Sequence, residues 1–397
     1  MGGMTRTMAE RRSRNRGIGR MQWPAIALGL ALLGTGCGTG SNSGGTTNGN
    51  SAQATNTTAN PDRPKVVASG GVVCDLAQQI AGETIDLTCL VQPGRDPHTY
   101  EPTPSDRAAI ESASLVLYGG YDFEGGLTKT LTSAPTQGPK VAIFEKAVPS
   151  PLKMAAHDHD HDHGHDHDHD HEDDHDHKAE AAAKPEEHDH DHDADPKTAT
   201  GEAAELVADP HVWHSPQNGQ KLTAIVAAQL SQLIPTQADR YQQAAQALTG
   251  ELQALDRWIQ TQVATVPPDR RRLITTHDAL RYYAQAYGFE VKGALSGLST
   301  EERPTPSKLA ELVKLVKAAN VPAIFAEAST NPKTIATVAR EAGVQVAANP
   351  LYIDGPGAPG TAGSTYQTML ISNTCTVVNA LGGQCEPKTA PLGKSGS

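Results

Sequence analysis

The sequence predicts an α/β fold of two layered lobes, each with a parallel sheet, joined by one long rigid helix. Short β-branched segments alternate with helical segments between residues 65 and 148, and again between residues 271 and 354. Such alternation is typical of parallel sheets covered by helices. A single helical pattern at residues 238–266 separates the two series. A chain of 397 residues is long enough for two such domains.

The first lobe is expected at residues 64–234. Gly82 is expected to end its first helix, and Ser105 is expected to cap its second helix after Pro104. The predicted strands are residues 65–69, 84–91, 114–120 and 140–148. The predicted helices are residues 72–82, 104–113 and 218–234. Residues 150–208 interrupt this pattern with a polar, low-complexity composition, which predicts a disordered surface loop inserted in the lobe.

The connecting helix is expected within residues 235–267, because Pro267 and Pro268 end its pattern. About 29 residues of helix would extend about 40 Å. The second lobe is expected at residues 268–390. Its predicted strands are residues 271–277, 289–295, 321–329 and 344–354. Its predicted helices are residues 279–288, 305–320 and 331–343, followed by a helical stretch within about the last 30 residues.

The first 37 residues have the pattern of an export signal. Six arginines precede an apolar stretch of 11 residues at 23–33, which is too short to span a bilayer, and Cys37 follows small residues. We therefore expect a leader that ends in a lipidated Cys37, although Gly34 stands where leucine is usual at such sites. Residues 38–63 are expected to be a flexible tether. The protein would then be periplasmic or extracytoplasmic and held to the membrane by its lipid.

Four further cysteines follow Cys37. An exported protein meets an oxidising environment, so these cysteines can pair. A disulfide between Cys375 and Cys385 is the preferred expectation because it would staple the C-terminal segment, and a Cys74–Cys89 pair is the alternative for the other two. The sequence contains no CxxC motif, which argues against a cysteine zinc site.

Thirteen of the 17 histidines lie in one alternating His-Asp tract. Such a tract cannot build a core, but imidazole nitrogens and carboxylate oxygens can collect divalent metal with low affinity. Residues 157–193 also contain 12 Asp, 4 Glu and 2 Lys, so this segment carries a formal charge of −14 against −12 for the whole chain, and nothing indicates nucleic-acid binding. The histidines of the tract are His157, His159, His161, His163, His165, His167, His169, His171, His175, His177, His188, His190 and His192.

Three of the other four histidines are placed where strands are expected to end. His98 follows the strand 84–91, His211 lies where the regular pattern resumes after the tract, and His277 ends the strand 271–277. Open α/β sheets bind ligands at the carboxyl ends of their strands. Two facing lobes would therefore bring these three imidazoles to one inter-lobe cleft, where they could bind a metal ion.

Four motifs, in this order, resemble those of a known family. They are PGRDPHTYEPTPSD, DPHVWHSP, THDALRYYAQAYG and PLYIDG. The chain resembles the metal-binding solute-binding proteins of bacterial ABC importers, cluster A-I or cluster 9, of the zinc-uptake type with a His-rich loop. The resemblance covers about residues 65–385. It implies Zn²⁺ as cargo, a membrane ABC permease and its ATPase as partners, a monomer, and no enzymatic activity. The metal ligands that it implies are His98, His211, His277 and Asp354.

Some alternatives stay open at this point. His214 follows His211 by three residues where the family usually has another pattern, so it is a candidate auxiliary ligand. Glu101 and Asp278 could orient imidazoles, or cap helices instead. Glu327 ends a predicted strand and could face the cleft or be structural. The alternatives to zinc delivery are a surface zinc buffer or adhesin-like protein, or manganese as the cargo. A hydrolytic zinc enzyme is not expected, because the candidate ligands come from separate lobes, whereas such a site also needs an open coordination position and a general base.

Overall fold

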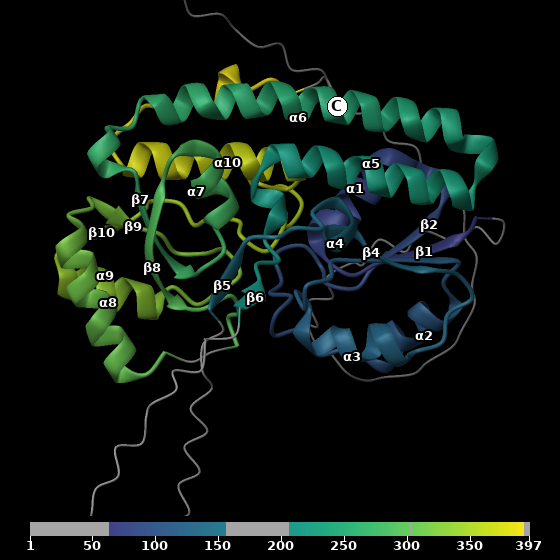
Figure 1. Cartoon of the computed structure of the whole chain (residues 1–397), viewed down its shortest axis with the longest axis horizontal. Coiled ribbons are helices and arrows are strands. Elements are labelled where there is room, and N and C mark those ends of the chain that lie inside the picture. The colour runs from purple at the N-terminus through teal and green to yellow at the C-terminus, as the bar shows by residue number, and fades with distance from the viewer. Residues whose placement is uncertain (1–62, 156–205, 302–303, 393–397) are drawn as a thin grey trace, which may run out of the picture. The chain divides into compact units, whose positions relative to one another are not determined.

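The computed structural model describes residues 63–155, 206–301 and 304–392. The leader, Cys37, the tether up to residue 62 and the His-Asp tract lie outside these residues. Within the described residues the predicted fold class is confirmed, since parallel sheets are layered with helices in two lobes (Figure 1). No helix among the described residues is long and apolar enough to cross a membrane.

A four-stranded parallel sheet forms the centre of the first lobe. Its strands are β1 (Lys65–Ala68), β2 (Asp86–Cys89), β3 (Leu115–Tyr118) and β4 (Lys140–Ala142), in the order β2-β1-β3-β4. All three pairings are parallel. Val66 and Val67 of the central strand point to opposite faces and both are buried, because helices cover the two faces.

Helices surround this sheet. They are α1 (Gly71–Ala81), α2 (Pro104–Ser112), α3 (Gly125–Ser133), α4 (Ile143–Ala147) and α5 (Pro216–Leu233). Gly82 ends α1 with a positive φ, as expected. Two predictions are wrong here. Thr103 caps α2 in place of Ser105 because it forms a capping box with Asp106. The strand predicted at 140–148 ends at Ala142, and the next five residues are α4.

The segment predicted as one disordered loop, residues 150–208, has ordered ends. β5 (Lys153–Ala155) and β6 (Leu206–Ala208) form an antiparallel ribbon, so the loop prediction is wrong at these residues. The ribbon is held at its base, where the Leu152 N–H donates to the Tyr282 hydroxyl at 2.9 Å. Main-chain pairing between the two ends supplies order that the side chains alone do not indicate.

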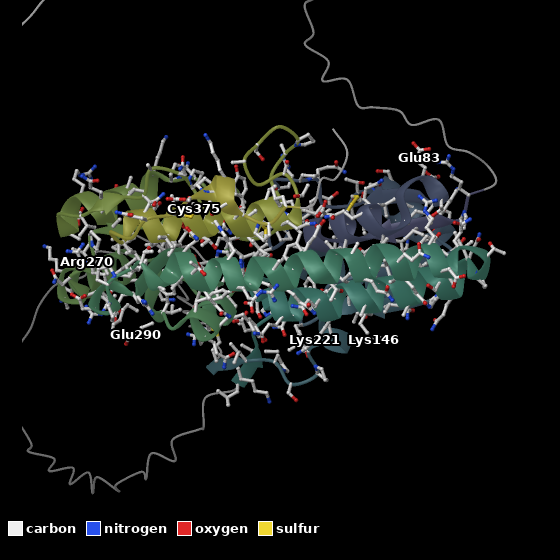
Figure 2. The ribbon with its side chains drawn as sticks, turned by 90° about the horizontal axis from the view of Figure 1, so that it is seen from above. Glu83, Lys146, Lys221, Arg270, Glu290 and Cys375 are labelled. Carbon is white, nitrogen blue, oxygen red and sulfur yellow. A yellow bond between two sulfur atoms is a disulfide. The ribbon has the colours of Figure 1, made fainter. Side chains whose placement is uncertain are left out.

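Helix α6 (Ala238–Ala264) is the longest helix among the described residues, with 27 residues. It packs against α5, α1 and α7, and against α10 (Tyr366–Ala380), so it contacts helices of both lobes. Figure 1 shows it running along α5 and α10, and Figure 2 shows it from above. Apolar residues at helical spacing form its buried face: Tyr241, Ala245, Leu248, Leu252, Leu255, Ile259 and Val263.

The second lobe is built on β7 (Arg272–His277) and β8 (Glu290–Ser296), which pair in parallel, and on β9 (Ala323–Ile324) and β10 (Gln345–Val346), which form a second parallel pair. The Phe325 N–H donates to the Ile274 carbonyl at 3.0 Å and links the two pairs. The helices are α7 (Arg281–Tyr287), α8 (Pro306–Ala319) and α9 (Lys333–Ala342), besides α10.

The strands predicted at 321–329 and 344–354 are too long. Only two residues of each form a regular ladder, and an isolated parallel bridge joins Glu327 to Leu351 further along. The chain leaves the regular ladder as it approaches the cleft, which frees side chains there for other contacts. Both cysteine pairs that the sequence suggested are present, Cys74–Cys89 and Cys375–Cys385 (Figure 2, which labels Cys375).

Candidate metal centre

Four buried side chains converge between the two lobes. Donor atoms of His98, His211, His277 and Asp354 all lie within 4.8 Å of one another. The exposed fractions of these residues are 3%, 0%, 0% and 6%. His98 lies in the loop between β2 and α2, His211 follows β6 by three residues, and His277 ends β7. Asp354 lies between the Leu351 bridge and α10. The sequence separations show that tertiary structure alone brings these atoms together.

Two Asp-Pro-His turns position the first-lobe histidines. The Asp96 carboxylate accepts the His98 backbone N–H at 3.0 Å, and the Asp209 carboxylate accepts the His211 backbone N–H at 2.9 Å. Aspartate is well suited to such a bond with a backbone N–H two residues later. Asp209 Oδ1 also lies 2.9 Å from His211 Nδ1. That contact leaves Nε2 of His211 to face the centre of the cluster.

Glu327 positions the second-lobe histidine in the same way. Its two oxygens accept separate hydrogen bonds, one from the His277 backbone N–H at 2.9 Å and one from His277 Nδ1 at 2.8 Å. Nε2 of His277 therefore points to the centre, 3.3 Å from His211 Nε2. Carboxylates that hold the outer nitrogen of an imidazole fix its tautomer and raise its basicity toward a metal.

The inner donor atoms have few protein partners. Asp354 Oδ1 lies 3.5 Å from Nε2 of both His98 and His277. Asp354 Oδ1 and His98 Nε2 are buried atoms without a hydrogen-bond partner among the described residues. Buried polar atoms are nearly always paired, so such atoms indicate a site for a ligand. Donors at the corners of a tetrahedron about 2 Å from its centre lie about 3.3 Å apart. The measured separations fit one divalent ion.

Burial and neighbouring charges give the imidazoles different pKa values. Burial lowers the pKa of His211 well below its ordinary value, assisted by the nearby His277. Burial also acts to lower the pKa of His277, but the carboxylates of Glu327 and Asp354 outweigh it and raise that pKa to about 9. Burial acts to raise the pKa of Asp354, yet the adjacent His277 and His98 lower it overall. Near neutral pH, His211 is therefore neutral, while His277 is cationic and Asp354 anionic in the metal-free site.

Aromatic rings form the first-lobe wall of the cluster. The Phe123 ring lies edge-on to His98, with centroids 5.2 Å apart, and packs against Trp213 at 4.7 Å. The Trp213 indole N–H donates to the Ile353 carbonyl at 3.0 Å, next to Asp354. The Tyr366 hydroxyl donates to the Trp213 carbonyl at 2.6 Å. These buried contacts join the two lobes beside the donors and keep water from that side.

The loop that carries His98 also contacts the second lobe directly. The Thr300 hydroxyl donates to Asp96 Oδ2 at 2.6 Å, and the Gly94 N–H donates to the Pro356 carbonyl at 3.2 Å. Asp96 therefore accepts one hydrogen bond from its own loop and one from the other lobe. The position of His98 depends on the contact between the lobes.

The remaining candidates occupy other places. His214 is buried with its ring against Trp213, and its Nε2 is not among the four converging donor atoms. Glu101 is exposed. Asp278 receives two hydrogen bonds from Arg281.

Local sequence patterns do not indicate a role for Asp209, and they leave the role of Glu327 undecided. The repeated Asp-Pro-His pattern at residues 96–98 and 209–211 is the signal that could have identified Asp209. For Glu327 no local signal exists, because its contact with His277 spans 50 residues.

Comparisons with known proteins identify the family of this chain. A family model described as "Zinc-uptake complex component A periplasmic" matches residues 66–380. The manganese-binding lipoprotein MntA of Bacillus subtilis (strain 168) is 30% identical over 321 residues, which cover 80% of this chain and 89% of the relative. The zinc-binding protein TroA of Treponema pallidum (strain Nichols) is 29% identical over 324 residues, which cover 80% and 89%.

A solved structure of the periplasmic zinc-binding protein TroA from Treponema pallidum has the same fold. It superposes with a TM-score of 0.64 at 28% sequence identity, and the match covers 80% of this chain and 99% of that chain. The family model spans most of the chain, from the first strand of the first lobe to the last helix of the second. The chain therefore belongs to the cluster A-I family of periplasmic metal-binding solute-binding proteins, as its motifs predicted.

Proposed function

We propose that this protein captures Zn²⁺ outside the cytoplasmic membrane and delivers it to an ABC permease and its ATPase. One observation carries the proposal: three imidazole nitrogens and one carboxylate oxygen, all buried, converge within 4.8 Å of one another. The family membership supports an importer component over a surface buffer or adhesin-like protein, and over an enzyme. The protein acts by binding and release, with no covalent step.

The donor set supports zinc as the cargo. Zn²⁺ favours imidazole nitrogen with carboxylate oxygen in a four-coordinate tetrahedron, whereas Mn²⁺ favours more oxygen donors. Here three donors are nitrogen and one is oxygen. Relatives named for zinc and relatives named for manganese match this chain at similar identity, so the comparisons do not select the metal. A tighter affinity for Mn²⁺ than for Zn²⁺ would replace zinc by manganese in this proposal.

Capture couples the two lobes. His98 and His211 belong to the first lobe, while His277 and Asp354 belong to the second, so a bound ion ties one to the other. Helix α6 packs on helices of both lobes and resists a large hinge motion. Opening is then a modest tilt or a local loop movement that breaks contacts such as the Thr300–Asp96 hydrogen bond. Because all four ligands are buried, release requires that opening.

The His-Asp tract is proposed to hold zinc weakly and raise its local concentration near the cleft. The ordered ribbon β5–β6 anchors both ends of the inserted segment, and β6 leads within three residues to His211. Many weak ligands on a tethered chain gain from effective concentration. A protein that lacks residues 157–193 should keep its tight zinc site and lose the weak ones. Cells that produce only this protein should grow less well in scarce zinc. Unchanged growth in scarce zinc would contradict this role.

Calorimetric titration of the tract-deleted protein tests the main proposal. One tight zinc site per chain is expected. Replacement of His98, His211 and His277 by alanine in that background should abolish it, while a His214→Ala variant serves as the matched control and should retain it. A crystal structure with anomalous scattering at the zinc edge would identify the ligands. Retained tight binding in the triple variant would refute the site.

Cys37 lipidation can be tested by mass spectrometry, and the expected monomer by sedimentation.

A further inference from the structure

The two carboxylate oxygens of Asp354 have different environments. Oδ1 faces the cluster, 3.5 Å from Nε2 of both His98 and His277, and has no hydrogen-bond partner among the described residues. Oδ2 accepts a hydrogen bond from the Ser329 hydroxyl at 2.8 Å. The carboxylate is thus held with one oxygen toward the centre and the other engaged by Ser329.

Ser329 owes its position to the irregular end of a strand. The Ala328 N–H donates to the Leu351 carbonyl at 2.8 Å, next to the parallel bridge between Glu327 and Leu351. Glu327 lies at the bridge and Ser329 lies in the bend that follows it, and the side chains of both reach donors of the cluster. Glu327 holds His277 and Ser329 holds Asp354. One strand end therefore orients both second-lobe donors.

Other carboxylate oxygens near the cluster are engaged by the histidines that they position. Asp209 holds the outer nitrogen of His211 through Oδ1, and both oxygens of Glu327 accept N–H groups of His277. Across the described ranges, the four-residue cluster is the single group that places three or more such donors close together. Oδ2 of Asp354 is a further oxygen donor on a residue that already belongs to the cluster, and Ser329 engages it.

We propose that Ser329 is a specificity-determining residue that keeps Asp354 monodentate and so favours a four-coordinate ion. This inference rests on the proposed function, because it assigns the choice of cargo to the same site. A tetrahedral set of three nitrogens and one oxygen suits Zn²⁺, whereas a bidentate carboxylate would add the fifth donor and second oxygen that favour Mn²⁺. Ser329 selects between them without touching the ion.

The test compares Ser329→Ala with Ser329→Thr in the tract-deleted protein, which lacks residues 157–193 and is otherwise unchanged. Competition titrations give the Zn²⁺ and Mn²⁺ affinities, and X-ray absorption of the zinc-loaded protein gives the number of light-atom donors. Ser329→Ala should lower the Zn²⁺/Mn²⁺ affinity ratio about tenfold, within the range for residues that orient metal ligands. It should also add an oxygen to the zinc shell. Ser329→Thr keeps the hydroxyl and should match the unmodified protein.

The outcomes separate this inference from the proposed function. A four-coordinate, tight zinc site in the unmodified protein, with the same ratio and shell in Ser329→Ala, would overturn the role of Ser329 alone. Absence of a tight zinc site in the unmodified protein would overturn the proposed function. A ratio that falls equally in Ser329→Thr and Ser329→Ala would show that packing at residue 329, and not the hydroxyl, sets the selectivity, which would also refute the inference.

Discussion

Metal binding should release a proton from His277, and the number released can be worked out from the structure. The carboxylates of Glu327 and Asp354 overcome the effect of burial and raise the pKa of this imidazole to about 9. Near pH 7.5 the metal-free ring is therefore protonated, and a metal ligand must be deprotonated. Asp354 is already ionised and His211 already neutral at this pH, because their pKa values are lowered. Binding of one metal ion should thus release about one proton from the site between the lobes.

The proton competes with the metal, and its effect on affinity follows from the pKa. Each pH unit below about 9 should lower the apparent affinity about tenfold, which is about 100-fold at pH 7, or about 2.7 kcal/mol. The effect on the metal-free fold has the opposite sign. A raised pKa means that protonated His277 stabilises the fold fully below about pH 6.5, and this contribution is lost as the pH rises through about 9.

Calorimetry in buffers of different ionisation enthalpy measures the released proton directly. The tract-deleted protein is needed, because tract histidines would release protons of their own. The Glu327→Gln variant removes the charge that raises the pKa of His277, and its amide N–H₂ cannot accept the second N–H of that residue. We expect the proton count to fall well below one and the intrinsic affinity to fall about 10- to 100-fold. Zero protons released by the parent protein at pH 7.5 would refute the reasoning.

Three further predictions concern stability and exchange. Gly219→Ala in α5 should destabilise the fold by about 1–3 kcal/mol in thermal melts, because its Cβ would lie 2.3 Å from the buried Tyr366 hydroxyl. Gly250→Ala in α6, with nothing within 4 Å, should instead stabilise by about 0.5–1 kcal/mol, and equal effects would contradict the packing argument. Thr300→Val should speed metal dissociation in stopped-flow chelation, while Thr99→Val, exposed on the His98 loop, should not. Chelation of the bound metal should lower the melting temperature, and an unchanged temperature would exclude coupling of the lobes by the ion.

Local sequence patterns predicted most elements and missed some for identifiable reasons. The segment at residues 140–148 mixes apolar, β-branched and charged residues, and so short a segment does not distinguish a strand from a helix. In the structure α4 begins at Ile143, and the N–H of Phe144 in its first turn donates to the Gly119 carbonyl. Thr103 caps α2 because Asp106 stands three residues later and completes a capping box. The sequence contains this pattern, but Ser105 is also a residue that often caps helices, and the two were not distinguished. These errors concern which of two local options the surroundings favour.

The sequence by itself determined the alternation of strands and helices, the long helix between two lobes and the family, because periodicity and motifs depend on near neighbours in the chain. It also named the four side chains that converge. Tertiary structure decided what holds them: Glu327 contacts His277 across 50 residues, and Ser329 contacts Asp354 across 25. Contacts of that range depend on how the strand ends of the second lobe meet. No local pattern of carboxylates and hydroxyls encodes that meeting, so only the folded chain shows which of them orient the donors.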